Sequence, residues 1–396
     1  MENSYIFNIV DDQLYEVDDE AFGLLERFNG TTTLGEIADS VPDKDEFEDF
    51  TDYLIEEGII LLNNEPSSST ELIPHIASSP DPSLRYLLLH ITTKCNLACK
   101  HCYLGDTHVE ELDIDSVNAL AEEFAAMQGL KLMISGGEPL LHSQFWGILE
   151  SVSKLDLRIV LLSNGTLIDR NTANRLANYV HEVQISIDGT ESHDMLRGSG
   201  TFDRSMQGIR NIKDAGIDVS IATMVHRHNL NEFEEMKKMF SDIGVCQWGV
   251  DVPCSVGNLA NNLDFSADLR EASRIFSEYG FGGGAHESSG NYTCGSHLAA
   301  VMANGDVVRC AFFADGAGGN IREGLLHSWD NLCNSHLWTT DKLDCDDCDI
   351  INDCRGGCRF RALQLCGSLM APDPVMCYAN GIEKYLYNIG FTIDVK

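Results

Sequence analysis

Short apolar runs alternate with amphipathic stretches through the middle of the chain. The runs predict buried strands, and they lie at 85–91, 131–135, 158–163, 183–187, 218–225 and, with a weaker pattern, 246–252. Between them, apolar residues recur at helical spacing, as in DIDSVNALAEEFAAM and NLNEFEEMKKMF. Repeated strand–helix units predict an α/β fold with a parallel sheet covered by helices. Six such units could form a doubly wound sheet or a partial barrel.

Polar and glycine-rich segments follow several of these strands directly. They are the cysteine loop KCNLACKHCY, then SGGEP at 135–139, SNGT at 163–166 and SIDG at 186–189. All of them would lie at the carboxyl ends of the strands, where active sites assemble in parallel barrels and sheets. This placement favours the partial barrel, a (β/α)6 arrangement of the TIM type, and we expect it to comprise residues 85–255.

The two ends of the chain have a different pattern. Residues 1–65 predict a strand pair, three helices and a closing strand, IILLN, which together resemble a winged-helix domain. Residues 66–84 are rich in Ser and Pro and predict a linker. Residues 256–396 lose the strand–helix rhythm and are rich in Gly and Cys, as expected of a domain that metal holds together.

The composition of the chain limits which binding partners and which cellular compartment we expect. The chain of 396 residues carries a formal net charge of -35, which argues against nucleic acid because phosphate backbones require Lys and Arg. Its first residues lack the features of a signal peptide, and no stretch has the roughly 18 apolar residues of a membrane span. These features predict a cytoplasmic protein with no membrane partner. In that reducing compartment, the 14 cysteines predict metal ligands rather than disulfides.

Three of the cysteines form the motif C-x3-C-x2-C, at Cys95, Cys99 and Cys102. Such a tight loop can direct three thiolates to one 4Fe-4S cluster and leave the fourth iron without a protein ligand. An open metal position is what a catalytic site needs, because a substrate or cosubstrate must bind there. A zinc site that lacks one ligand is the alternative.

Together with SGGEP one strand later, this loop resembles the radical S-adenosylmethionine (SAM) enzymes over roughly residues 85–255. In that family the open iron is chelated by the amino and carboxylate groups of SAM. The resemblance therefore implies a 4Fe-4S cluster and SAM as cofactors. It implies that these residues contact the cosubstrate: His101, Gly136, Gly137, Glu138, Pro139, Ser163, Asn164, Ser186, Asp188 and Arg197.

The resemblance also gives roles to individual positions. Gly136 to Pro139 match the segment that receives the amino group of SAM, and a backbone edge and a carboxylate can accept hydrogen bonds from an ammonium group. Arg197 matches the residue that pairs with the carboxylate of SAM. His101 holds a position near the adenine that is usually aromatic.

The remaining matches lie at the ends of two further strands. Ser163 and Asn164 match positions near the cosubstrate, and Ser186 and Asp188 match the region of its ribose and carboxylate. For Ser163, Asn164 and Asp188, a role in forming turns is the alternative.

Seven further cysteines follow the pattern C-x10-G-x4-C, C-x2-C-x5-C-x3-C and a final C, at Cys294, Cys310, Cys345, Cys348, Cys354, Cys358 and Cys377. Spacing alone leaves a zinc knuckle open, because thiolates bind both zinc and iron–sulfur clusters. With the barrel, the pattern resembles the SPASM extension of radical SAM maturases, which holds two auxiliary clusters. The resemblance assigns the second cluster to Cys345, Cys348, Cys354 and Cys377, and the first to Cys294, Cys310 and Cys358.

The first auxiliary cluster is then one ligand short. Either one of its irons is open, so that a substrate thiolate could bind there, or another cysteine completes it. The candidates are Cys246, Cys254, Cys333 and Cys366. For each of these four, a buried apolar side chain is the simpler interpretation, since free cysteine packs well in protein interiors.

The resemblances together predict a radical SAM/SPASM maturase of a ribosomally made precursor peptide, with three 4Fe-4S clusters and SAM. A ferredoxin or flavodoxin would supply the electron. Residues 1–65 are similar to the PqqD-like small protein of the pyrroloquinoline quinone pathway, beside whose sheet a leader peptide adds as a strand. A structural cap or a dimer contact is the alternative for this module.

The expected product is a Cys thioether, formed when a peptide thiolate attacks the carbon from which a 5'-deoxyadenosyl radical has removed hydrogen. Carbon–carbon crosslinking, formylglycine formation of the sulfatase type and cofactor maturation are alternatives that use the same chemistry. An iron–sulfur electron carrier or a zinc-binding adaptor is the alternative outside the enzymes. In such a protein SGGEP and Arg197 would have no purpose.

Overall fold

The computed structural model describes residues 4–63, 78–105, 108–280, 291–293, 295–314 and 316–388. The chain divides into two compact units, Met1–Asp81 and Pro82–Lys396. Within the described ranges, none of the helices has the length and apolar character of a membrane span.

The first unit consists of a two-stranded antiparallel sheet followed by three helices: β1 (Ser4–Asn8), β2 (Gln13–Val17), α1 (Asp19–Leu25), α2 (Leu34–Ala38) and α3 (Lys44–Glu56). Each helix begins after a residue whose side chain accepts a backbone N–H of the first turn, namely Asp18, Thr33 and Asp43. Ile37 and Leu54 are fully buried within this unit. The strand pair and the three helices therefore form as predicted.

The predicted closing strand at 59–63 is wrong. The backbone N–H groups of Ile59 and Ile60 both donate to the carbonyl of Leu54, at 2.8 and 3.2 Å, so this segment satisfies the carboxyl end of α3 instead. Leu61 and Leu62 are 71% and 60% exposed. Among the described residues of this unit, β1 and β2 pair only with each other. The winged-helix assignment therefore stays a prediction.

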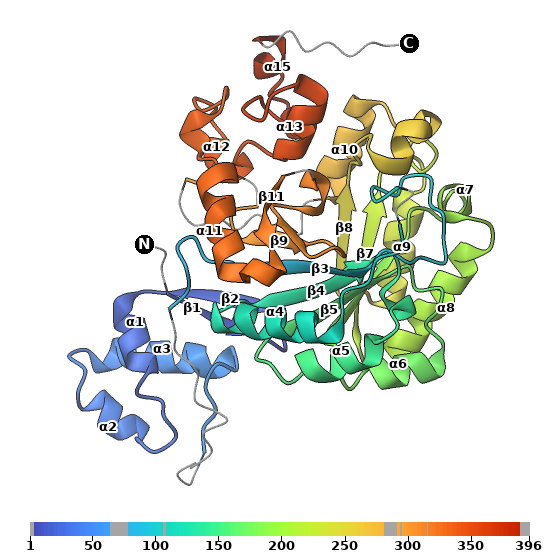
Figure 1. Ribbon diagram of the computed structural model, residues 1–396. Helices are drawn as coiled ribbons and strands as arrows, with labels where there is room; N and C mark the ends of the chain where they lie inside the picture. The colour runs from blue at the N-terminus through green and yellow to red at the C-terminus, as the bar shows by residue number, and fades with distance from the viewer. Residues whose placement is uncertain are drawn as a thin grey trace. The chain divides into compact units, whose positions relative to one another are not determined.

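The second unit is built around a nine-stranded sheet in the order β11-β10-β9-β3-β4-β5-β6-β7-β8. Figure 1 shows β3, β4 and β5 side by side in this sheet. The six predicted strands are confirmed as β3 (Tyr86–Thr92), β4 (Lys131–Gly136), β5 (Arg158–Ser163), β6 (Glu182–Ser186), β7 (Asp218–Met224) and β8 (Gln247–Asp251). These six pair in parallel and in chain order. A doubly wound sheet reverses its order at a switch point, so this order favours the partial barrel. The α/β class and the mostly parallel sheet are confirmed.

Helices connect the strands and cover one face of the sheet (Figure 1). The helices of this unit are α4 (Ile114–Ala126), α5 (Phe145–Val152), α6 (Arg170–Leu176), α7 (His193–Arg197), α8 (Thr201–Asp214), α9 (Phe233–Ile243), α10 (Leu269–Tyr279), α11 (Leu325–His336), α12 (Ile351–Cys354), α13 (Arg359–Cys366), α14 (Pro374–Ala379) and α15 (Lys384–Asn388). The helices α4, α5, α6, α8 and α9 all contribute buried apolar side chains to one core that they share with the strands.

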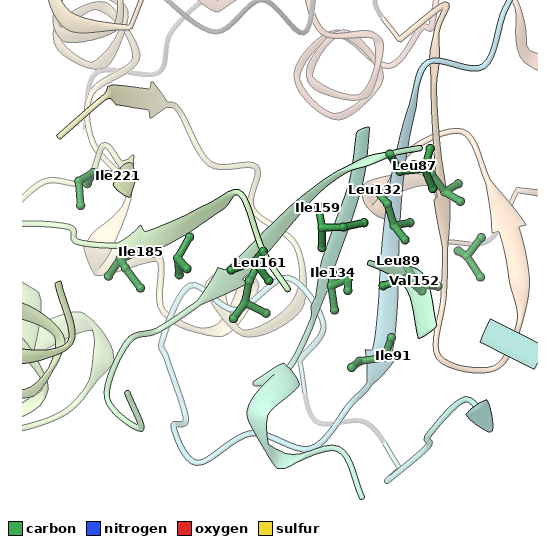
Figure 2. Packing of buried hydrophobic residues seen from close by; sticks show 14 of the residues in the cluster. Leu87, Leu89, Ile91, Leu132, Ile134, Val152, Ile159, Leu161, Ile185 and Ile221 are labelled. Atoms are coloured by element: carbon green, nitrogen blue, oxygen red, sulfur yellow. The ribbon is translucent and has the colours of Figure 1, made fainter. Parts of the chain in front are cut away.

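This main core lies on the helix-covered face of the sheet. Leu87 and Leu89 of β3 and Leu132 of β4 are fully buried in it (Figure 2). Because successive side chains of a strand point to opposite faces, His90 and its register partner Ser135 lie on the other face. The alternation therefore separates the packed apolar face from a face that carries polar side chains.

Part of the cysteine-rich region joins the same sheet and core. The strand β9 (Leu298–Val301) pairs in parallel with β3, and β10 (Asp306–Val308) and β11 (Ala317–Asn320) follow in antiparallel order. Trp329 of α11 is fully buried in the main core, and its indole N–H donates to the carbonyl of Pro82 (2.9 Å). The strand β9 and the helix α11 therefore support the barrel directly.

We expect the substitution Trp329→Ala to lower the free energy of unfolding by about 3–5 kcal/mol, because it removes a large buried side chain and leaves a cavity. Leu326→Ala is the matched control on the same helix, since Leu326 is 42% exposed. Urea unfolding monitored by circular dichroism measures both. Equal stabilities of the two variants would show that α11 contributes little to the packing of the barrel.

Candidate active site

The three-cysteine loop follows β3 and is held by hydrogen bonds from two distant segments. The backbone N–H of Lys100 donates to the carbonyl of Leu196 in α7 (2.9 Å). Asn258, after β8, donates its backbone N–H to the carbonyl of Cys102 (2.8 Å) and its side-chain amide to the carbonyl of Cys99 (3.0 Å). The loop is therefore held by contacts from α7 and from the segment after β8.

The thiols of Cys95, Cys99 and Cys102 lie close enough to interact electrostatically, and Arg197 lies near Cys95 and Cys99. Burial raises the pKa of Cys99 to about 11, while the Arg197 cation acts in the opposite direction. Metal ligands must be thiolates, so the binding of iron would release the thiol protons. Three soft donors within electrostatic range of one another fit the 4Fe-4S cluster that the resemblance implies.

The end of β4 touches the segment that leads into this loop, and two glycines permit the contact. Gly136 has a φ of +132°, and a Cβ on it would lie 2.2 Å from the carbonyl oxygen of Thr92. A Cβ on Gly137 would lie 2.3 Å from the carbonyl oxygen of Lys94. The N–H groups of Gly137 and Glu138 donate to these same two carbonyls, at 2.8 and 2.7 Å. Glycine is required for such an approach, so SGGEP fixes β4 against the cysteine loop.

The side chain of Glu138 is fully buried and points to the end of β5. Its carboxylate accepts hydrogen bonds from the hydroxyl of Ser163 (2.9 Å) and the backbone N–H of Asn164 (2.9 Å). Burial raises the pKa of Glu138 to about 7, and the two hydrogen bonds act in the opposite direction. These bonds give Glu138 a positioning role between β4 and β5. Its contact with the amino group of SAM stays a prediction.

The SNGT turn after β5 returns to the cysteine loop. The side-chain amide of Asn164 donates to Oδ1 of Asn96 (3.0 Å), and the amide of Asn96 donates to the hydroxyl of Thr166 (2.8 Å). Oδ1 of Asn164 also accepts the backbone N–H of Thr166 (2.9 Å). Asn164 therefore forms the turn, which was one alternative, and also connects this turn to the loop that carries the cysteines.

Asp188 and Arg197 form an ion pair at the end of β6, with Nε of Arg197 2.5 Å from the fully buried carboxylate. Burial alone would raise the pKa of Asp188, but the Arg197 charge and nearby histidines hold it well below its usual range. Nη2 of Arg197 lies 3.3 Å from Nε2 of His101. Burial lowers the pKa of His101 to about 4, with a further contribution from Arg197. Three predicted SAM-binding residues thus form one group beside the cysteine loop.

The other two predicted positions take their places at the strand ends. Pro139 is the first residue of the short helix η2 (Pro139–Leu141), which follows β4. Ser186 is the last residue of β6, paired with Ala222 of β7, two residues before Asp188. The strand order therefore brings all ten predicted SAM-binding residues to the carboxyl ends of β3–β6 or to α7, directly after β6.

Sequence analysis missed Asn96, Thr166 and Asn258. Asn96 lies in KCNLACKHCY and Thr166 lies in SNGT. Their polar side chains within these two motifs were the sequence feature that could have identified them. Asn258 belongs to a segment without a motif. Its neighbour Gly257 has a φ of +55°, and a Cβ there would lie 2.3 Å from the carbonyl oxygen of Cys102. Only the three-dimensional structure shows that this segment contacts the cysteine loop.

Four of the C-terminal cysteines line a single cavity: Cys345, Cys348, Cys354 and Cys377. Within the described ranges, no three His, Cys, Asp or Glu side chains are arranged around one metal ion. In a 4Fe-4S cluster each thiolate binds a different iron, so the ligands lie further apart than they do around a single metal ion. Four cysteines around one cavity fit such a cluster. Cys310 and Cys358 do not line this cavity, and Cys294 lies outside the described residues.

Comparison with known proteins gives a family match for part of the chain. Residues 89–240 match the Radical SAM superfamily. The AdoMet-dependent heme synthase of Nitratidesulfovibrio vulgaris is 27% identical over 354 residues, which cover 77% of this chain and 95% of that protein. The mycofactocin maturase MftC of Mycolicibacterium smegmatis is 33% identical over 165 residues, 40% of this chain and 42% of that protein.

Among solved structures, SuiB of Streptococcus suis, bound to its precursor peptide SuiA, has a similar fold. The TM-score is 0.66 at 18% identity, over 94% of this chain and 96% of that chain. Residues 89–240 therefore form a radical SAM domain, and the protein is an enzyme. A radical SAM domain implies a 4Fe-4S cluster and SAM.

We expect Gly137→Ala to weaken SAM binding by roughly 5- to 150-fold, because a clash with the Lys94 carbonyl costs about 1–3 kcal/mol and displaces the cysteine loop. Gly249→Ala is the matched control in the same sheet, since its Cβ would meet nothing closer than 3.8 Å. Calorimetric titration of the cluster-loaded proteins with SAM measures both. Wild-type affinity in Gly137→Ala would show that the loop does not depend on this contact.

Proposed function

We propose that this enzyme modifies a ribosomally made precursor peptide in the cytoplasm. The observation that carries the proposal is the separate N-terminal unit ahead of the radical SAM domain. The similarity to SuiB, a protein solved with its precursor peptide, covers 94% of this chain and so extends into that unit. A sequence relative, MftC, is a maturase by its name. The unit would bind the leader of the peptide, whose strand could add to the two-stranded sheet.

In this proposal the residues at the strand ends hold the cofactors. Cys95, Cys99 and Cys102 would ligate the first cluster, and Arg197 has further N–H donors beyond the one it gives to Asp188. When bound, the cluster and SAM supply hydrogen abstraction by a 5'-deoxyadenosyl radical, after an electron arrives from a ferredoxin or flavodoxin. The chain's own part is to fix the loop, keep Asp188 ionised and keep His101 neutral.

The C-terminal cysteines would hold two auxiliary clusters, which makes three in total. The cavity of Cys345, Cys348, Cys354 and Cys377 supports one of them. We propose a Cys thioether as the product, with a peptide thiol attacking the carbon that has lost hydrogen and the auxiliary clusters accepting the remaining electron. Carbon–carbon crosslinking is the alternative that the same residues would support.

A second candidate is the maturation of a haem-type cofactor. The heme synthase of Nitratidesulfovibrio vulgaris supports it, because the similarity covers 95% of that protein. It covers 77% of this chain, however, so a substantial part has no counterpart there. Anaerobic reactions with candidate Cys-containing peptides and with iron porphyrins, followed by mass spectrometry, separate the two functions.

We expect replacement of Cys95, Cys99 and Cys102 by Ala to abolish SAM cleavage and to remove one cluster's iron, while the absorbance of the auxiliary clusters remains. The reason is that these three thiols are the only protein ligands proposed for the SAM-binding cluster. Anaerobic reconstitution, iron analysis and chromatographic assay of 5'-deoxyadenosine measure the effect. Normal 5'-deoxyadenosine formation would refute the assignment.

Deletion of residues 1–65 should separate recognition from chemistry. We expect the affinity for a full-length precursor peptide to fall at least about tenfold, a loss of about 1.4 kcal/mol, while SAM cleavage without peptide persists. The compact unit Pro82–Lys396 retains the whole barrel, which is why the chemistry should survive. Fluorescence anisotropy with a labelled candidate peptide measures the affinity. An unchanged affinity would assign another role to the N-terminal unit.

A further inference from the structure

The first auxiliary cluster has one ligand too few in the sequence pattern, and the structure distinguishes between the four spare cysteines. Cys246 is exposed at the start of β8, far along the strand from its carboxyl end. Cys333 packs against the main core from α11. Cys366 ends α13, and its thiol lies 3.7 Å from the carbonyl of Pro372. Cys254 differs, because it lies at the carboxyl end of the barrel strands, three residues after β8.

Aromatic side chains bring Cys310 and Cys358 to the same place. Cys310 is followed by Phe312 and Phe313, and Cys358 by Phe360. The ring of Phe360 stacks on Phe312 with centroids 5.4 Å apart and meets Phe313 edge-on at 5.1 Å. Two cysteines that are 48 positions apart in the sequence therefore flank one aromatic cluster.

The segment that carries Cys254 is tied to this place by Arg361, one turn after Cys358 in α13. Its guanidinium donates to the carboxylates of Asp251, at the end of β8, and Asp373. Asp373 is buried and also accepts the backbone N–H of Cys358 (2.8 Å). One ion-pair network thus holds the end of β8 against the start of α13.

A second set of contacts involves the residues just after Cys254. Gly257 contacts the backbone of Cys102 and Tyr103, where a Cβ would clash. The ring of Tyr103 lies 5.2 Å from that of Phe312. The segment is therefore held from both sides, by the cysteine loop of the barrel and by the aromatic cluster beside Cys310.

The electrostatic neighbours agree with this geometry. Burial raises the pKa of Cys254 to about 12; Arg361 lowers it, while Asp251, Asp373 and the Cys310 thiol raise it. Arg361 also interacts with Cys358. Of the four spare cysteines, Cys254 is the one whose pKa is affected by a predicted ligand of the first auxiliary cluster, Cys310.

We propose that Cys254 is a ligand of the iron–sulfur cluster that Cys310 and Cys358 bind, so that the barrel itself supplies one thiolate to the first auxiliary cluster. On binding, the Cys254 thiol transfers its proton to solvent and its sulfur bonds to iron. The inference rests on the proposed auxiliary clusters and not on the identity of the substrate. With Cys294, which the sequence resemblance assigns to the same cluster, Cys254 would make four cysteine ligands, so a substrate thiolate would have no vacant iron there and the cluster would be left with electron transfer.

The test uses the full chain with Cys95, Cys99 and Cys102 replaced by Ala, so that only auxiliary clusters remain. We expect adding Cys254→Ser to lower the iron content by at least about one iron per chain and to change the electron paramagnetic resonance (EPR) signal of one reduced cluster. Cys366→Ser in the same background is the matched control and should change neither. Equal iron and identical spectra for Cys254→Ser and its parent would overturn the proposal.

A second measurement does not depend on how the serine variant folds. Carbon-13-labelled cyanide binds to an iron that has no protein ligand, and its carbon nucleus then splits the EPR signal of that cluster. The parent protein, which has the three Ala replacements and an intact Cys254, should therefore show no such splitting. Cyanide coupling in that parent would mean that an open iron remains, which contradicts a complete ligand set. Neither measurement uses a peptide, so a wrong substrate assignment would leave both results unchanged.

Discussion

The catalytic end of the barrel depends on the contact of β4 with the segment that enters the cysteine loop. Two glycines let the backbones meet, and the contact positions Glu138 so that its buried carboxylate reaches the end of β5. The turn after β5 then returns through Asn164 to Asn96, inside the cysteine loop. The contacts form a closed ring, so a displacement at one strand end is transmitted to the cysteines.

A second group of contacts controls charge at the same end. Asp188 and Arg197 neutralise each other, with the Asp188 side chain fully buried and the Arg197 side chain 11% exposed, and loss of Arg197 would leave a buried carboxylate without its cation. Arg197 is also close to the cysteine thiols, whose thiolate forms it favours. It has donors left for a carboxylate, which is what a cosubstrate with an amino-acid end requires. The ion pair therefore orients the cation before any ligand arrives.

Sequence analysis predicted β3–β8 because each is a short run of Leu, Ile and Val bounded by polar motifs, and it found the glycines and cysteines because their spacing is unusual. It failed at 59–63, where an apolar run has no neighbouring strand in the described residues and instead caps a helix. It also missed the pairing of β9 with β3, whose partners lie about 200 positions apart, and the role of Asn258. Such contacts depend on tertiary position, which local patterns do not contain.

The same limitation explains why Cys254 could not be chosen from four equivalent cysteines. What distinguishes it is the end of β8, held by Arg361 to the start of α13, and this network exists only in the folded chain. A buried cation with two carboxylates is costly to form unless every partner is in place. A cluster ligated from both sides would add a covalent link between the same two segments. The barrel and the cysteine-rich region would then share one metal centre, which fits a sheet and a core that already extend through both.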